Sequence, residues 1–222
     1  MSTSAPRWAQ RDLVRLGRML AGRQVLVTGA TGFIGRPLVR YLRAGGVSVS
    51  ALARTGGGGV RAWPHDLETD PGRLVRHIRR RPPAIVMHLA APEPAAAGDT
   101  CRLVERGLVQ IEHLLESCLT LPHPPRLVLV SSSAVYGPSD GRPLTEGHPP
   151  APASYHGAGK LLAEALATRA SAAAGLPVVR VRPFNVIGPG QAPTRVLPRM
   201  AEQVARREAG HADTIVTRGL DG

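Results

Sequence analysis

Short runs of β-branched and apolar residues alternate along the chain with longer segments of helical periodicity, from about residue 23 onward. Such alternation is typical of a parallel sheet whose strands are joined by crossover helices. It predicts a doubly wound α/β fold with helices on both faces of the sheet. The expected strands are 23–28, 47–53, a short one within 60–67, 84–90, 126–131 and 178–186, and the expected helices are 33–44, 71–81, 99–120, 156–174 and 195–209.

The same pattern divides the chain into three parts. Residues 1–22 form an N-terminal helical extension, residues 23–190 hold the predicted sheet, and residues 191–222 look like the start of a further region. The extension places Arg11, Arg15 and Arg18 at helical spacing beside apolar neighbours, which predicts a surface helix packed beside the first strand. A membrane-surface or targeting helix is the alternative.

The composition favours a globular domain with its own core. The chain has 222 residues, of which 43% are hydrophobic, and this is enough to bury a sizeable core. No apolar stretch approaches the length of a membrane span. The two cysteines, Cys101 and Cys118, lie in one predicted helix, so we expect reduced thiols in a cytoplasmic protein. We expect no metal site and no membrane partner.

The charge is strongly positive, with a formal net charge of +12. Nucleic-acid binding is the weakest of the functions that this charge suggests, because the arginines are spread along the chain and aromatic residues make up only 3%. Of the 28 basic residues, 27 are arginines and one is a lysine, Lys160. Lysine has a compact ammonium whose pKa can move, whereas arginine stays charged, so Lys160 is a candidate for chemistry.

A glycine-rich turn, Gly29-x-x-Gly32-x-x-Gly35, links the first predicted strand to the first predicted helix of the sheet region. In this context the first glycine allows a tight turn, the second lets the backbone approach a diphosphate, and the third lets helix and strand pack closely. The helix N-terminus offers N–H groups and partial positive charge to the phosphates. The sequence therefore predicts a Rossmann-type domain that binds a nicotinamide dinucleotide.

The end of the second predicted strand bears on the choice of coenzyme. An acidic residue there would bond the ribose 2′-hydroxyl of NAD, whereas arginine suits the 2′-phosphate of NADP. The residue at this point is Arg54, so NADP(H) is favoured over NAD(H). An ordinary surface arginine is the alternative.

Taken in order, five segments of the chain resemble the extended short-chain dehydrogenase/reductase family, the NAD(P)-dependent epimerases and dehydratases. They are residues 28–35, 66–67, 88–91, 131–137 and 182–190. The resemblance implies a coenzyme site. Together with the glycine turn and Arg54, it gives the predicted coenzyme-binding residues: Gly29, Thr31, Gly32, Phe33, Ile34, Gly35, Arg54, Asp66, Leu67, Leu89, Ala90, Ala91, Lys160, Pro183 and Asn185.

The resemblance also implies hydride transfer at a secondary alcohol carbon. In this family a tyrosine phenol exchanges the proton, a lysine four residues later lowers the pKa of that phenol and holds the ribose, and a serine or threonine bonds the substrate oxygen. Here Ser132 matches the hydroxyl, with Ser133 as its neighbouring alternative, and Lys160 matches the lysine. Members commonly form dimers through two long helices, which correspond to 99–120 and 156–174, so a homodimer is expected.

The tyrosine does not match. His156 lies four residues before Lys160, and Tyr155 lies five before it. On a helix, four residues turn through about 400°, so His156 shares a face with Lys160, while Tyr155 lies about 140° away. Three interpretations stay open: His156 replaces the tyrosine as acid/base, Tyr155 reaches the site because it precedes the regular helix, or the redox function is lost or altered.

The chain is also short for this family, which usually carries a longer C-terminal substrate-binding region. We therefore expect residues 191–222 to be a truncated or rudimentary form of that region. The predicted function is that of an NAD(P)-dependent oxidoreductase, epimerase or dehydratase acting on a sugar-nucleotide or a related hydroxylated metabolite. The alternative is a coenzyme-binding protein without redox turnover, such as a sensor, a partner subunit or a repurposed non-redox enzyme.

Overall fold

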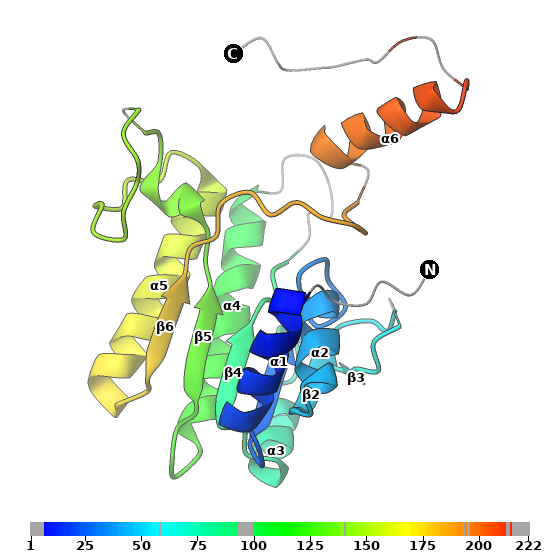
Figure 1. Cartoon of the computed structure of the whole chain (residues 1–222). Coiled ribbons are helices and arrows are strands. Elements are labelled where there is room, and N and C mark those ends of the chain that lie inside the picture. Colours follow the sequence, from blue (N-terminus) through cyan, green and yellow to red (C-terminus); the bar gives the residue numbers. More distant parts are fainter. Residues whose placement is uncertain are drawn as a thin grey trace. The chain divides into compact units, whose positions relative to one another are not determined.

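The computed structural model describes residues 7–57, 59–92, 100–139, 141–192, 194, 196–211 and 214. Within these residues, six parallel strands form one sheet in the order β3-β2-β1-β4-β5-β6 (Figure 1). The predicted parallel α/β sheet is therefore confirmed. The strands are β1 Gln24–Thr28, β2 Ser48–Ala53, β3 Trp63–Pro64, β4 Ile85–His88, β5 Arg126–Val130 and β6 Val178–Val181.

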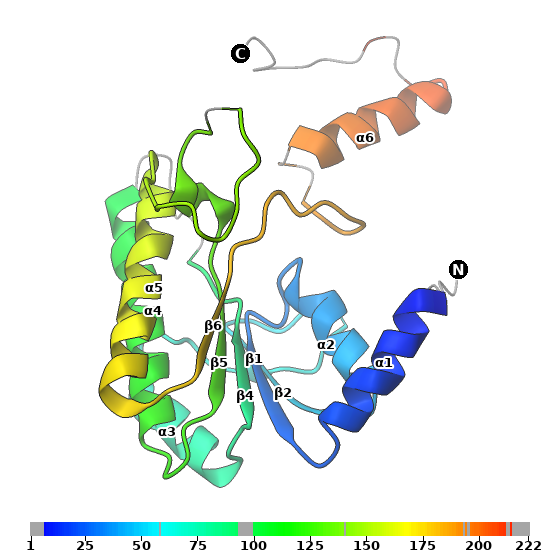
Figure 2. The ribbon, with the colours of Figure 1, turned by 60° about the vertical axis from the view of Figure 1, so that its left-hand side comes forward.

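Helices cover both faces of this sheet, as predicted. Figure 2, in which the sheet is seen nearly edge-on, shows α1 and α2 on one face and α3, α4 and α5 on the other. A short 3₁₀ helix, η1, follows β5. The bounds are α1 Arg7–Met19, α2 Gly35–Ala44, α3 Pro71–Arg80, α4 Thr100–Leu119, η1 Ser133–Tyr136 and α5 Tyr155–Ala174.

The strand order reverses beside β1. The chain runs from β1 outward to β2 and β3, and then returns to β4 on the other side of β1 before continuing to β5 and β6. In open α/β sheets, ligands bind outside the carboxyl ends of the strands at such a reversal. The glycine-rich turn follows β1 and the segment 89–91 follows β4, so both lie at this place in the fold.

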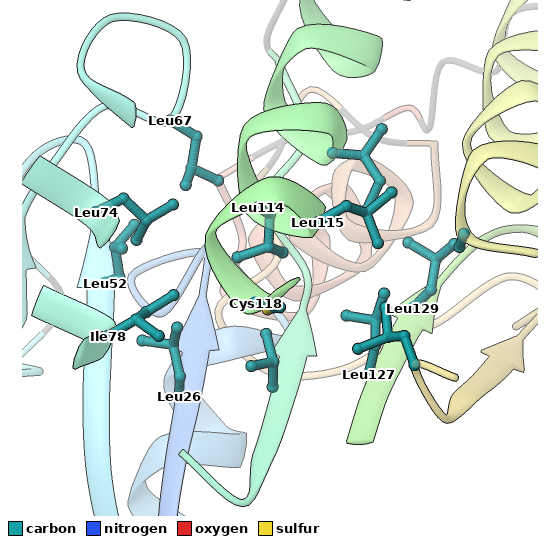
Figure 3. Packing of buried hydrophobic residues seen from close by; sticks show 14 of the residues in the cluster. Leu26, Leu52, Leu67, Leu74, Ile78, Leu114, Leu115, Cys118, Leu127 and Leu129 are labelled. Carbon is teal, nitrogen blue, oxygen red and sulfur yellow. The ribbon is translucent and has the colours of Figure 1, made fainter. Parts of the chain in front are cut away.

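The larger hydrophobic core lies between the sheet and the face that carries α3, α4 and α5. Leu26 of β1 and Leu127 of β5 belong to one cluster with Leu74 and Ile78 of α3 and Leu114 of α4, and Figure 3 shows the side chains of this cluster gathered between strands and helices. These side chains are fully buried. Each fully buried Leu or Ile contributes roughly 1.5–3 kcal/mol of hydrophobic free energy, so this face supplies much of the stability of the domain.

The N-terminal extension forms the helix α1, which packs on the opposite face. Leu16 and Leu20 join the second hydrophobic cluster, which also contains Val25 and Val27 of β1. Gly17 lies so close to the Gly45 carbonyl at the end of α2 that a β-carbon could not fit. A helix thus stands where the sequence predicted one. Among the described residues, no helix is long and apolar enough to cross a membrane.

Both cysteines are free thiols, as expected. Cys101 is exposed on the first turn of α4, and Cys118 is buried in the core near the end of the same helix. Burial raises the pKa of the Cys118 thiol to about 12, so it stays protonated and packs as an apolar side chain.

The sixth strand is shorter than predicted. It ends at Val181 rather than at residue 186, because Pro183 has no N–H to donate and cannot continue a hydrogen-bonded ladder. The chain divides into two compact units after Phe184, six residues before the boundary predicted at 190. The second unit, residues 185–222, contains the helix α6, Val196–Glu208.

Candidate functional site

The turn after β1 needs glycine at its first position. Gly29 has a φ of +66°, and a β-carbon on it would lie 2.7 Å from the Ala90 nitrogen and 2.8 Å from the Leu89 carbonyl carbon. The turn therefore rests directly on the backbone that follows β4. Only a residue without a side chain allows both the positive φ and this approach.

The third glycine packs the helix α2 onto the same turn. A β-carbon on Gly35 would overlap the Gly29 carbonyl and lie 2.9 Å from the Ala30 Cα, while the Gly32 N–H donates to the Gly29 carbonyl at 3.0 Å. Ile34 at the N-cap provides no side-chain cap, and the first turn holds no acidic residue. The positive end of the helix dipole is thus left for an anion. Residues fitting a diphosphate are therefore present. Among the predicted contact residues here, Thr31 and Phe33 are half-buried, while Gly32 and Ile34 are exposed.

A buried polar pair fixes the backbone under this turn. Thr28 and His88 face each other at the ends of β1 and β4, with 2.8 Å between the Thr28 Oγ1 and the His88 Nδ1. The Ala90 N–H donates to the same Thr28 oxygen at 3.2 Å. Burial, assisted by the positive charge of Lys160, lowers the pKa of His88 to about 3, so its ring is neutral. Sequence reasoning did not single out this pair as a hydrogen-bonded unit, although two polar residues at the ends of buried strands were the available signal.

The expected ribose and adenine side of the site lies beyond β2 and β3. Arg54 follows β2 and is exposed. Asp66 makes a local turn by accepting from the Glu68 N–H at 3.0 Å. The Leu67 side chain is buried in the core and its carbonyl is 2.7 Å from the His113 Nδ1, so a coenzyme could contact Leu67 only through main-chain atoms.

Glu68 anchors this loop to α4. Its carboxylate accepts from Arg106 at 2.7 and 3.1 Å and from Gln110 at 2.7 Å. The Arg106 hydrogen bonds hold the pKa of Glu68 below its usual value, and the positive charge of Arg54 acts in the same direction. Arg54 therefore lies within electrostatic reach of the adenine-side loop.

The segment after β5 presents the predicted catalytic hydroxyl. Ser132 is the N-cap of η1, and its Oγ accepts from the Ala134 N–H at 3.2 Å. Because this bond uses only a lone pair of the hydroxyl, its proton remains for another acceptor. The Ser133 N–H donates to the Pro183 carbonyl at 2.9 Å, which ties η1 to the end of β6. Asn185 belongs to the second compact unit, and Ala91 is exposed just after β4.

The helix α5 begins directly against η1. Ser154 caps it by accepting from the Gly157 N–H at 3.1 Å, and a β-carbon on Gly157 would overlap the Ala134 carbonyl. Tyr155 is already the first helical residue and is 60% exposed. Because the helix already includes Tyr155, that residue lies on a different face from Lys160. His156 is the residue one turn before the lysine.

Lys160 extends from this helix to the sheet. Its Nζ donates to the Val130 carbonyl at the end of β5 at 3.1 Å. Burial lowers the pKa of the Lys160 ammonium. The single lysine of the chain thus bonds the end of β5, two residues before Ser132, and its charge reaches the β4 histidine.

One turn further along α5 lies an ion pair that sequence reasoning missed. Glu164 is 2% exposed, and its carboxylate accepts from Arg182 at 3.0 and 2.6 Å. Burial alone would raise the pKa of Glu164, but the hydrogen bonds from Arg182 lower it below its usual value. The same hydrogen bonds raise the pKa of Arg182. The Arg182 guanidinium also lies over the ring of buried Tyr136, 4.7 Å from its centroid.

Comparison with known proteins places these features in one family. The sequence profile of the NAD dependent epimerase/dehydratase family matches residues 25–221. GDP-6-deoxy-D-mannose reductase of Pseudomonas aeruginosa is 29% identical over 192 residues, which cover 85% of this chain and 60% of that protein.

Two solved structures share the fold. UDP-glucose 4-epimerase of Thermus thermophilus in complex with NAD has a TM-score of 0.73 at 32% identity, covering 83% of this chain and 63% of that one. RMD from Pseudomonas aeruginosa complexed with NADPH has a TM-score of 0.71 at 30% identity, covering 85% and 63%. The chain thus spans about three-fifths of the length of the relatives it matches. It belongs to the NAD-dependent epimerase/dehydratase family.

Proposed function

We propose that this chain binds NADP(H) and acts as an oxidoreductase, epimerase or dehydratase on a sugar-nucleotide or a related hydroxylated metabolite. The observation that carries the proposal is the junction of Gly29 with the backbone of Leu89 and Ala90. Two further contacts support it. The Lys160 Nζ donates to the Val130 carbonyl, two residues before Ser132, and Gly157 packs against the Ala134 carbonyl in η1.

The bound coenzyme would supply the hydride acceptor or donor. His156 is proposed to take the proton from the substrate hydroxyl, and Ser132 to donate a hydrogen bond to the same oxygen. A phenol, with a pKa near 10, needs a nearby ammonium before it can act as a base at neutral pH. Imidazole is a base near neutral pH without such help, so the Lys160 ammonium would instead bind the ribose.

A panel of UDP-, GDP- and dTDP-hexoses with each coenzyme tests this function. We expect coenzyme reduction or epimerised product with at least one member, and a loss of about 10²-fold or more in the His156→Gln and Lys160→Ala variants. Tyr155→Phe is the matched control, because it removes a hydroxyl beside His156 on a different face of the helix. Turnover that persists in both His156→Gln and Lys160→Ala would refute the assigned roles.

The displaced tyrosine favours one other function. The chain would then bind the coenzyme without redox turnover, as a sensor, a partner subunit or a non-redox enzyme. Calorimetry separates the two: tight NADPH binding without any conversion of the hexose panel supports the second function, and conversion of any member rules it out.

The preference for NADP(H) is supported by Arg54, whose charge reaches the Glu68 loop.

We also propose a homodimer through α4 and α5, since Leu162 and Leu166 of α5 are 48% and 39% exposed. Light scattering should give twice the chain mass, and Leu166→Arg should shift it to the monomer. Two reduced cysteines suit a cytoplasmic location.

A further inference from the structure

Lys160 and Glu164 are separated by four residues on α5. Side chains at this spacing are neighbours on a helix, with about 5–6 Å between their β-carbons, and a carboxylate and an ammonium placed so would ordinarily attract each other. Here the Glu164 carboxylate binds a different cation. Arg182, directly after β6, donates hydrogen bonds to both Glu164 oxygens at 3.0 and 2.6 Å.

The choice of partner matters because the acceptor is buried. Glu164 is 2% exposed, so water cannot replace its partner, while the Arg182 side chain is 15% exposed. Within the described part of the chain, the Lys160 ammonium has one hydrogen bond, to the neutral Val130 carbonyl. Its charge is therefore left without a carboxylate.

Arg182 is itself held in place from a second element. Its guanidinium lies 4.7 Å from the centroid of the Tyr136 ring at the end of η1. A planar guanidinium that stacks on an aromatic ring while bonding a carboxylate with two N–H groups has little freedom to release either partner. Lysine could not reproduce this arrangement.

We propose that Arg182 is a positioning residue: it binds the Glu164 carboxylate and so prevents Glu164 from forming an ion pair with the Lys160 ammonium at the site. The assignment of Lys160 to that site rests on the proposed function. The electrostatic surroundings agree with this role: burial lowers the pKa of Lys160, whereas a paired carboxylate would raise it. Two groups of the sheet face this helix: burial and the Lys160 charge lower the pKa of His88 to about 3, so its ring is neutral, and the Arg180 charge lowers the pKa of Glu164 together with Arg182.

The single lysine makes a direct test possible. Protein grown with lysine labelled with ¹³C at Cε gives one lysine resonance, and its shift against pH reports the pKa of Lys160 without any assignment. In coenzyme-free Arg182→Gln we expect this pKa to rise by about one unit or more, because the released Glu164 then pairs with Lys160. The double variant Glu164→Gln/Arg182→Gln should return the pKa to the wild-type value.

Two outcomes would overturn the proposal: an unchanged Lys160 pKa in folded Arg182→Gln, or a raised pKa that persists in the double variant. If Arg182→Gln does not fold, Arg182→Met replaces it, because methionine fills part of the same space and adds no second lysine resonance. It cannot bind the Glu164 carboxylate, so the same rise is expected, and no rise would again overturn the proposal. Since the titration needs neither coenzyme nor substrate, a failure to bind NADPH would refute the proposed function and leave this result standing.

Discussion

The Gly35 Cα at the start of α2 lies so close to the Gly29 carbonyl that the space for a β-carbon on Gly35 is already taken. The contact joins the end of the glycine-rich turn to its beginning and sets the distance between α2 and β1. Two glycines six residues apart therefore act as one packing unit. The contact involves main-chain atoms and needs only glycine at these two positions, so the glycine spacing in the sequence is enough to predict it.

Gly35→Ala should accordingly damage both folding and coenzyme binding. The added methyl group would overlap main-chain atoms that cannot move without displacing β1, so we expect a loss of about 2 kcal/mol or more in unfolding free energy. Urea unfolding measures the stability, and a fluorescence titration with NADPH should show binding weakened by at least tenfold.

Gly72→Ala in the first turn of α3 is the matched control. A β-carbon there would meet only the side-chain ends of Arg76 and Asp70, at 3.4 and 3.6 Å. Alanine is favoured over glycine in a helix by up to about 1 kcal/mol, so stability should be unchanged or slightly higher and NADPH binding unaffected. Equal behaviour of the two variants would show that the Gly29–Gly35 contact is unimportant.

Coenzyme choice should respond to Arg54. Replacing it with glutamate puts a carboxylate at the end of β2, where it would repel a 2′-phosphate and accept a hydrogen bond from a 2′-hydroxyl. We expect Arg54→Glu to weaken NADPH binding by tenfold or more and to leave NADH binding equal or stronger. Calorimetry with both coenzymes measures the ratio. A ratio that does not change would make Arg54 an ordinary surface arginine.

The backbone features of this fold were predictable, whereas the side-chain partnerships were not. Glycines and strand patterning have local causes, and they located the glycine-rich turn and each strand of the sheet to within a few residues, apart from the end of β6. The Glu164–Arg182 pair joins residues 18 positions apart, and Thr28 and His88 are 60 apart. Such pairings depend on strand order and register, and no local pattern encodes them. Lys160 could be singled out because it is the one lysine in the sequence, but its hydrogen bond to the Val130 carbonyl could not be predicted.

Restoring a tyrosine at the acid/base position should separate the interpretations of the α5 sequence. His156→Tyr recreates the spacing of tyrosine and lysine that the family uses, with Lys160 placed to lower the pKa of the phenol. If His156 is the acid/base, this variant should keep a measurable fraction of turnover and move the rising limb of the pH profile to higher pH. His156→Gln should lose activity at every pH, and Tyr155→Phe should match the wild type. A profile that is the same in His156→Tyr, His156→Gln and the wild type would exclude His156.

Stability should fall as the solution becomes acidic, with His88 as the largest single cause. Its pKa is about 3 in the folded protein against 6.5 when exposed, so between these values the unfolded chain binds a proton that the folded chain refuses. The contribution of the neutral ring is complete above pH 6.5 and is lost progressively below it, at about 1.4 kcal/mol per pH unit. Burial lowers the pKa of His65 and His77 as well, which adds to the same trend.

The free energy of unfolding measured in urea at about pH 7 and about pH 5 should therefore differ by about 2 kcal/mol or more. His88→Asn keeps an acceptor for Thr28 but cannot titrate, and it should remove most of that difference. A pH dependence as steep in His88→Asn as in the wild type would place the titrating group elsewhere.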